Sequence, residues 1–148
     1  MFDLVIFPYH DWRKYEREGA RGRDLHLIKG FLEHSQVNKI LMINRPCSLA
    51  EITKNRVKKF PEYGLELESN KDYRLSKIND KMYTLDFFVK DFVGPIVMRR
   101  RWWANVLCRK KIEKIISNTI NKYLNNPLCI SFNPFAYKII EKLDFNKL

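Results

Sequence analysis

The first 46 residues place a charged segment and a helical pattern between two short apolar runs, and this order constrains the fold more than any other feature. The apolar runs predict buried strands over 3–8 and 39–43, because strands of a parallel sheet are short and continuously apolar. A helix is predicted over 24–34, with Asp24 as its N-cap. Strand, polar loop, helix and strand in this order predict a parallel α/β unit.

The middle of the chain interrupts this alternation. A capping box that starts at Ser48 predicts a basic helix to about Phe60. Alternating residues on both sides of a tight turn then predict a β-hairpin insertion over 73–88.

The last third returns to the α/β pattern. An apolar stripe predicts one long helix over 97–124, and a strand is predicted over 128–132. Asn133 as N-cap and Pro134 at the first helical position start a helix that ends at Leu143. The predicted fold is α/β: one Rossmann-like domain over 1–148, with a mostly parallel sheet flanked by helices.

Length and charge limit the class of protein. The chain has 148 residues, enough for one domain with a real core, and its formal net charge is +11, from 28 Lys and Arg against 17 Asp and Glu. This charge favours nucleic acid, an anionic membrane surface, or a phosphorylated or sugar-nucleotide substrate as partner, although a solvated lysine-rich surface explains it about equally well. No apolar stretch approaches the roughly 20 residues that a membrane span needs.

Several types of site lack their sequence signatures. The cysteines Cys47, Cys108 and Cys129 are widely spaced without a CxxC pair, so we expect neither a disulfide framework nor a metal site. The sequence has no G-x-G-x-x-G and no G-x-x-x-x-G-K-[ST] motif, which argues against a dinucleotide or P-loop site. The predicted compartment is the reducing cytoplasm.

Two strand ends carry candidate site residues. His10 and Asp11 follow the first strand, and either is a candidate general base, although His10 is equally well explained as an exposed loop residue. Asn133 and Pro134 follow the last strand, where a simple helix cap explains them as well. Because parallel strands end at one sheet edge, we expect both junctions to meet there.

The charged segment after the first strand has two explanations. Arg17, Arg21 and Arg23 alternate with acidic residues, which describes either a solvated, self-neutralising loop or an arginine clamp for phosphate or sugar hydroxyls. Gly19 and Gly22 fit both explanations, because glycine permits a tight turn.

The most basic stretch begins with Arg99, Arg100 and Arg101, followed by Trp102 and Trp103. We favour, in this order, an ordinary surface helix, a contact with an anionic membrane surface through 99–103, and binding of nucleic acid.

Three segments together resemble a known family. The chain is similar to the amino-terminal end of bacterial GT-B-fold glycosyltransferases of the "group 1" type in Phe7-x-Tyr9-His10-Asp11-Trp12-x-x-x-x-Arg17-Glu18-Gly19-x-Arg21-x-Arg23-Asp24-x-His26-Leu27-Ile28 and in Val37-x-Lys39-Ile40-Leu41-x-x-Asn44-Arg45-Pro46. A later segment, Phe132-Asn133-Pro134-Phe135, resembles a strand-end Asn-Pro of the same family.

The resemblance implies an acceptor-side domain of a transferase that moves a sugar from a nucleotide-sugar to a glycan or lipid-linked acceptor, as in polysaccharide biosynthesis. It implies a cytoplasmic enzyme, peripheral on the inner membrane face, and no cofactor in this chain other than the donor of the full enzyme. His10 and Asp11 would then lie on the acceptor side. The substrate-binding residues would be Trp12, Arg17, Gly19, Arg21, Arg23, Asp24, Asn133 and Pro134.

One departure from the family pattern matters. The donor half and its two glutamates eight positions apart are missing, so the resemblance implies an amino-terminal half that is inactive alone and needs a carboxyl-terminal donor-binding domain as partner. The alternative is a non-enzymatic basic module that binds nucleic acid or an anionic membrane surface.

Overall fold

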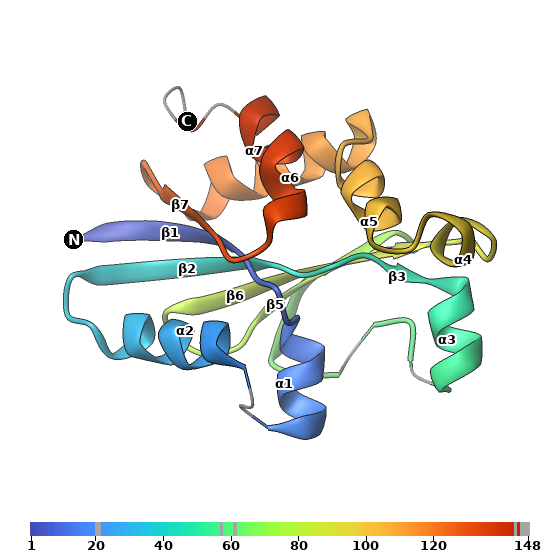
Figure 1. The fold of residues 1–148 in the computed structure, drawn as a ribbon. Coiled ribbons are helices and arrows are strands. Elements are labelled where there is room, and N and C mark those ends of the chain that lie inside the picture. Colours follow the sequence, from blue (N-terminus) through green and yellow to red (C-terminus); the bar gives the residue numbers. More distant parts are fainter. Residues whose placement is uncertain (20–21, 57, 61, 144, 146–148) are drawn as a thin grey trace.

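Seven strands form one mixed sheet in the computed structural model, which describes residues 1–19, 22–56, 58–60, 62–143 and 145 (Figure 1). Neighbouring strands follow the order β4-β5-β6-β2-β1-β7, and β3 pairs separately with β6. The strands are β1 (Phe2–Phe7), β2 (Val37–Ile43), β3 (Cys47–Ser48), β4 (Leu65–Ser69), β5 (Tyr73–Lys77), β6 (Met82–Val89) and β7 (Leu128–Ser131).

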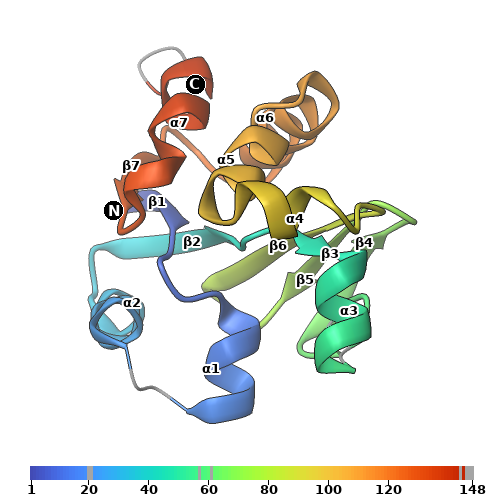
Figure 2. The same ribbon diagram turned by 45° about the vertical axis from the view of Figure 1, so that its right-hand side comes forward.

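Helices cover both faces of the sheet (Figures 1 and 2). Helices α1 and α2 pack on one face, and α5, α6 and α7 pack on the other. The helices are α1 (Trp12–Glu18), α2 (Arg23–Glu33), α3 (Leu49–Asn55), α4 (Gly94–Met98), α5 (Arg100–Leu107), α6 (Lys110–Tyr123), the 3-10 helix η1 (Pro134–Ala136) and α7 (Tyr137–Leu143).

The sheet combines parallel and antiparallel pairs. Strand β1 lies between β2 and β7 and is parallel to both, and β2 is parallel to β6. Strand β5, in contrast, is antiparallel to both β4 and β6. The predicted α/β class is therefore confirmed, whereas the expectation of a mostly parallel sheet is not.

The predicted β-hairpin over 73–88 is confirmed as β5 and β6. It is not an insertion, however, because β6 pairs with β2 in the middle of the sheet, with Met82 opposite Ile40 and Leu85 opposite Ile43. The residues of β6 from Met82 to Phe87 are all buried, as a strand covered on both faces requires.

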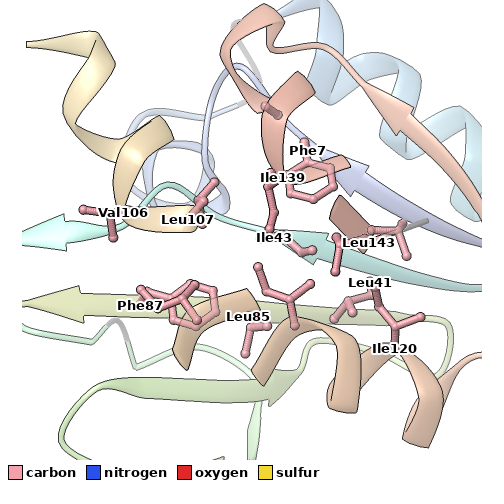
Figure 3. Packing of buried hydrophobic residues seen from close by; sticks show 14 of the residues in the cluster. Phe7, Leu41, Ile43, Leu85, Phe87, Val106, Leu107, Ile120, Ile139 and Leu143 are labelled. Atoms are coloured by element: carbon pink, nitrogen blue, oxygen red, sulfur yellow. The ribbon is translucent and has the colours of Figure 1, made fainter. Parts of the chain in front are cut away.

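Alternate residues of the central strands form two apolar clusters. Val5 and Phe7 of β1 face α5–α7, whereas Leu4 and Ile6 face α1 and α2. The larger cluster also receives Leu41, Ile43, Leu85 and Phe87 from β2 and β6 and Ile139 and Leu143 from α7 (Figure 3). Full burial of each such side chain stabilises the fold by roughly 1.5–3 kcal/mol.

The long helix predicted over 97–124 is in fact α4, α5 and α6. Arg99 has φ 49° and ψ −124°, and Arg109 has extended backbone, so the helix breaks twice. The breaks turn two separate apolar stripes toward the same sheet face. These stripes are Trp102, Trp103, Val106 and Leu107 of α5, and Ile112, Ile116 and Ile120 of α6.

Two members of the predicted membrane contact belong to the core. Trp102 is 5% exposed and Trp103 is 7% exposed. Trp102 Nε1 donates to Asp91 Oδ2 at 2.7 Å, and the Trp103 ring packs edge-on against Phe135 with 6.0 Å between ring centroids. The prediction is therefore wrong for both tryptophans, because a buried indole is not available to lipid. Of this segment, only the three arginines, 99–101, are exposed.

The predicted polar loop after β1 contains α1. Asp11 is the N-cap of α1, and its Oδ1 accepts from the backbone N–H of Lys14 at 2.9 Å. Gly22, and not Asp24, is the N-cap of α2, because the Asp24 carboxylate in the first helical turn bonds to His10 instead.

Two other predicted caps are confirmed. Ser48 Oγ accepts from Glu51 N at 3.1 Å, and Asn133 Oδ1 accepts from Phe135 N at 3.1 Å. Helix α3 ends at Asn55, earlier than the predicted end near Phe60, because Arg56 adopts the left-handed conformation.

Candidate functional site

Two strand-to-helix junctions meet at the carboxyl edge of the sheet. They lie side by side because β1 and β7 are parallel neighbours, with Phe7 opposite Ser131. A cavity of about 180 Å³, here called the His10 cavity, opens between them. Its lining includes His10 and Asp11 from the first junction and Asn133 from the second, so the two junctions meet as the sequence predicts. The complete lining is Tyr9, His10, Asp11, Lys14, Arg45, Arg100, Trp103, Asn133 and Phe135.

A larger cavity of about 500 Å³, here called the α3 cavity, lies beside it. Its walls come from the β2–α3 segment and from α4 and α5, including Glu51, Lys54 and Arg99. Arg45, Arg100 and Trp103 line both cavities, so the two form adjoining parts of one cleft.

His10 is held in the His10 cavity by a buried carboxylate. Asp24 Oδ1 lies 3.0 Å from His10 Nδ1, and Asp24 Oδ2 accepts from the backbone N–H of His10 at 2.8 Å. A carboxylate at Nδ1 favours the tautomer that carries the proton there, which leaves Nε2 as a proton acceptor. The pair has the arrangement in which a carboxylate orients a histidine base.

A glycine makes this pair possible. A Cβ atom at Gly22 would lie 2.6 Å from Asp24 Oδ1 and 2.8 Å from His10 Nδ1. Both distances are shorter than any normal contact, so a side chain at this position would push the imidazole and the carboxylate apart.

Asp11, the other predicted base, is bound to two arginines. Its Oδ2 lies 3.2 Å from Nη2 of Arg13 and 3.2 Å from Nη2 of Arg45. Burial alone would raise the pKa of Asp11, but Arg13, Arg45 and the backbone N–H of Lys14 hold that pKa below its usual value. Asp11 therefore remains ionised at neutral pH and serves as an anchor for Arg45 rather than as a base.

A buried polar network continues from Arg13 to β6. Arg13 Nη2 donates to the backbone oxygen of Arg45 at 2.7 Å, and Arg13 Nε lies 3.8 Å from Asp86 Oδ1. Asn44 Nδ2 and Tyr63 OH each donate to the Asp86 carboxylate at 2.9 Å. Burial raises the pKa of Asp86 despite these partners. The network fixes Asn44 and Arg45 at the end of β2, where the cavities open.

The mouth of the His10 cavity is positively charged. Lys14, Arg45 and Arg100 line it, while its carboxylate, Asp11, is already paired with Arg13 and Arg45. The Arg100 guanidinium lies 6.0 Å from the centroid of the Tyr9 ring, a cation–π arrangement that places it over the cavity. This set of charges suits an anionic group such as a phosphate or carboxylate.

The structure brings only some of the predicted site residues to this cavity. Trp12 is buried in the core, where its Nε1 donates to Glu16 at 2.8 Å. Gly19 caps α1 with φ 76°, and Arg23 is exposed at the start of α2. Pro134 is exposed beside Asn133. Arg21 and the Arg17 side chain lie outside the described residues.

Sequence reasoning missed several lining residues. Lys14 and Phe135 were not predicted as site residues, and Arg100 and Trp103 were assigned to a membrane contact. Arg45 offered a signal, because it lies two residues after the end of the second predicted strand and must therefore be near the same sheet edge.

No family model, curated protein or solved structure matches this chain. Within the described residues, no three His, Cys, Asp or Glu side chains gather in a way that could hold a metal ion. None of the helices described is long and apolar enough to cross a membrane.

Proposed function

We propose that the His10 cavity binds a hydroxyl-bearing ligand with an anionic group, and that this ligand is the acceptor of a glycosyltransferase. One observation carries the proposal: the imidazole held by Asp24 shares a cavity with Lys14, Arg45 and Arg100. A site that combines a proton acceptor with several cations suits a ligand that presents both a nucleophilic hydroxyl and a negative charge.

The chain would act as the acceptor-side domain. The resemblance of 7–28, 37–46 and 132–135 to "group 1" glycosyltransferases supports this role, because residues of all three segments line the cavity. The parallel pairing of β6, β2, β1 and β7 supports a Rossmann-like description of that part of the mixed sheet. In the proposal, a carboxyl-terminal domain binds the nucleotide-sugar, and the enzyme works in the cytoplasm.

The proposed chemistry assigns the proton to His10. The acceptor hydroxyl donates a hydrogen bond to Nε2 of His10, which takes the proton as the oxygen bonds to the anomeric carbon of the donor sugar. The bond from that carbon to the nucleotide diphosphate breaks, and the diphosphate leaves with the electron pair. Asp24 keeps the ring oriented and stabilises the imidazolium that forms.

A pair of neighbouring arginines provides the binding test. Calorimetric titration with glucose 1-phosphate, glucose and inorganic phosphate should show that the sugar phosphate binds more tightly than either part alone. Arg100→Gln should weaken binding about tenfold, because a charge-assisted contact contributes roughly 1.5–3 kcal/mol. Arg101→Gln is the matched control, since Arg101 is exposed and does not line the His10 cavity. Absent binding, or equal effects of the two variants, would refute the proposal.

The nucleic-acid alternative receives less support from α6. Lys111 pairs with Asp72, Lys122 with Glu68, and Lys142 of α7 with Glu113, so acidic residues interrupt the basic surface. A continuous positive face would instead give strong, salt-dependent binding. Binding of single-stranded RNA that falls steeply with added salt and persists in Arg100→Gln would favour this alternative.

A further inference from the structure

Five apolar side chains around α4 form an exposed cluster, here called the α4 knob: Phe92, Val93, Ile96, Val97 and Met98. Ile96 is 61% exposed and Val97 is 72% exposed. Other exposed large apolar residues among the described ones are spread over distant elements, as is normal for a protein surface. An apolar cluster within seven consecutive residues is different, because such patches mark interaction sites.

Hydrogen bonds to the Asp91 carboxylate fix the backbone of the α4 knob. Asp91 Oδ1 accepts from the backbone N–H of Gly94 at 2.9 Å, and Asp91 Oδ2 accepts from Nε1 of Trp102 at 2.7 Å. A Cβ atom at Gly94 would lie 2.5 Å from Cδ1 of Trp102, so the chain passes tightly over the indole. The buried indole of Trp102 therefore supports α4 from below, and the apolar side chains of the α4 knob project into solvent.

Positive charge surrounds the knob. Lys90, Arg99, Arg100 and Arg101 are all exposed, and Asp91 is the single acid within 90–101. The Asp91 carboxylate is engaged by Gly94 and Trp102, and these hydrogen bonds lower its pKa. These four cations, here called the cationic collar, thus flank the exposed apolar side chains of the α4 knob.

We propose that the α4 knob inserts into the surface of an anionic phospholipid bilayer while Lys90, Arg99 and Arg101 contact the headgroups. Apolar side chains flanked by Lys and Arg are the combination that peripheral proteins use at anionic lipid surfaces. A second copy of the chain fits less well, because each copy carries a formal charge of +11 and the same cationic collar. This inference does not depend on the proposed glycosyltransferase function.

The insertion also sets an orientation. Ile96 and Arg99 line the α3 cavity as well as belonging to the knob and its collar. A knob inserted in lipid therefore places the mouth of the α3 cavity next to the headgroup layer.

Sedimentation with vesicles tests the proposal. Vesicles of equal parts phosphatidylcholine and phosphatidylglycerol should bind the wild-type chain, and vesicles of phosphatidylcholine alone should bind it weakly. The double variant Ile96→Ser/Val97→Ser should lower the partition coefficient at least tenfold, because both side chains lose their apolar area. Leu27→Ser is the matched control, since Leu27 is a 51% exposed apolar residue on α2 and should leave partitioning unchanged.

A second pair of variants tests the cationic collar. Arg101→Gln should lower partitioning about fivefold, and Lys114→Gln, an exposed cation on α6, should lower it less. Circular dichroism of every variant confirms that it is folded. The proposal is overturned if the chain ignores anionic vesicles or if the knob variant partitions like the wild type. It is also overturned if the knob variant loses binding to a protein partner while keeping its vesicle binding.

Discussion

Substitution of Gly22 should separate His10 from Asp24 and destabilise the fold. The added Cβ would lie 2.6 Å from Asp24 Oδ1 and 2.8 Å from His10 Nδ1, so one of the two side chains must move. His10 is 30% exposed and can swing outward, whereas Asp24 is 7% exposed. The hydrogen bond at Nδ1 is then lost, and the buried carboxylate keeps only its backbone donor.

The expected cost for Gly22→Ala combines several contributions. Overpacking costs about 1–3 kcal/mol, and loss of the hydrogen bond adds about 1 kcal/mol. Replacing glycine reduces the entropy of the unfolded chain and returns roughly 0.4–1 kcal/mol. Because His10 can move, we expect the low end of the steric cost and a net loss of about 1–1.5 kcal/mol in the free energy of unfolding.

Two further glycine variants isolate the steric cause. Gly22 is the N-cap of α2, so Gly22→Ser restores a good cap but keeps the offending Cβ, and it should still destabilise. Gly30 lies within α2, and a Cβ added there would meet nothing within 4 Å, so Gly30→Ala should stabilise the protein by roughly 0.5–1 kcal/mol.

Urea unfolding and NMR of the His10 ring nitrogens measure both effects. In the wild type the neutral imidazole should carry its proton on Nδ1 and leave Nε2 unprotonated, and Gly22→Ala should show a mixture of tautomers. If Gly22→Ala and Gly30→Ala stabilise alike, or if the tautomer signals of the Gly22 variants match the wild type, the steric reasoning is refuted.

Three other outcomes are expected. Asp11→Asn should destabilise the protein by roughly 1–3 kcal/mol at pH 7, because Arg13 then keeps only the Asp86 carboxylate at 3.8 Å and Arg45, which is 41% exposed, loses its charged partner. The pKa of Asp11 is lowered in the folded state, so its carboxylate contributes to the free energy of unfolding above the unfolded-state pKa. This contribution is lost as the pH falls through the folded-state pKa. In urea unfolding from pH 7 to acid, the free energy of unfolding of Asp11→Asn should therefore fall less steeply than that of the wild type. Cys47 is buried and its pKa is raised to about 11, so iodoacetamide at pH 8 should modify it only when urea unfolds the protein. Rapid labelling of Cys47 in the folded protein, measured by mass spectrometry, would contradict this expectation. Trp102→Phe should lose about 1–2 kcal/mol by leaving Asp91 without its indole donor, while Tyr137→Phe, at an exposed position, should unfold at the wild-type urea concentration.

The parts of the fold that local sequence specifies were predictable. Strands β1, β2 and β7 are short apolar runs between polar segments, and the caps at Ser48 and Asn133 are side-chain devices confined to four residues. Helix α1 was missed because its sequence is largely charged, and its stability depends on Trp12 packing beneath the sheet. The double break of the predicted long helix was missed because a periodic stripe does not reveal that two segments must approach the same sheet from different directions.

The site was only partly predictable for a related reason. Parallel strand order places His10 and Asn133 at one edge, which the sequence pattern indicates. The pairing of Asp11 with Arg45, and of Arg13 with Asp86, joins residues from separate elements of the chain whose relation depends on strand order and side-chain direction. Arg100 was not predicted as a cavity residue for the same reason. The sequence indicates only that it belongs to a basic helix, whereas the fold directs its side chain over the ring of Tyr9.

The shared wall of the two cavities links their occupancies. Arg45, Arg100 and Trp103 belong to both linings, so a molecule in one cavity restricts side chains that also shape the other. The first ligand to bind already orders these side chains, so the second ligand loses less conformational entropy when it binds. Two ligands that occupied both cavities would therefore bind with coupled affinities, each changing the affinity of the other by the same factor.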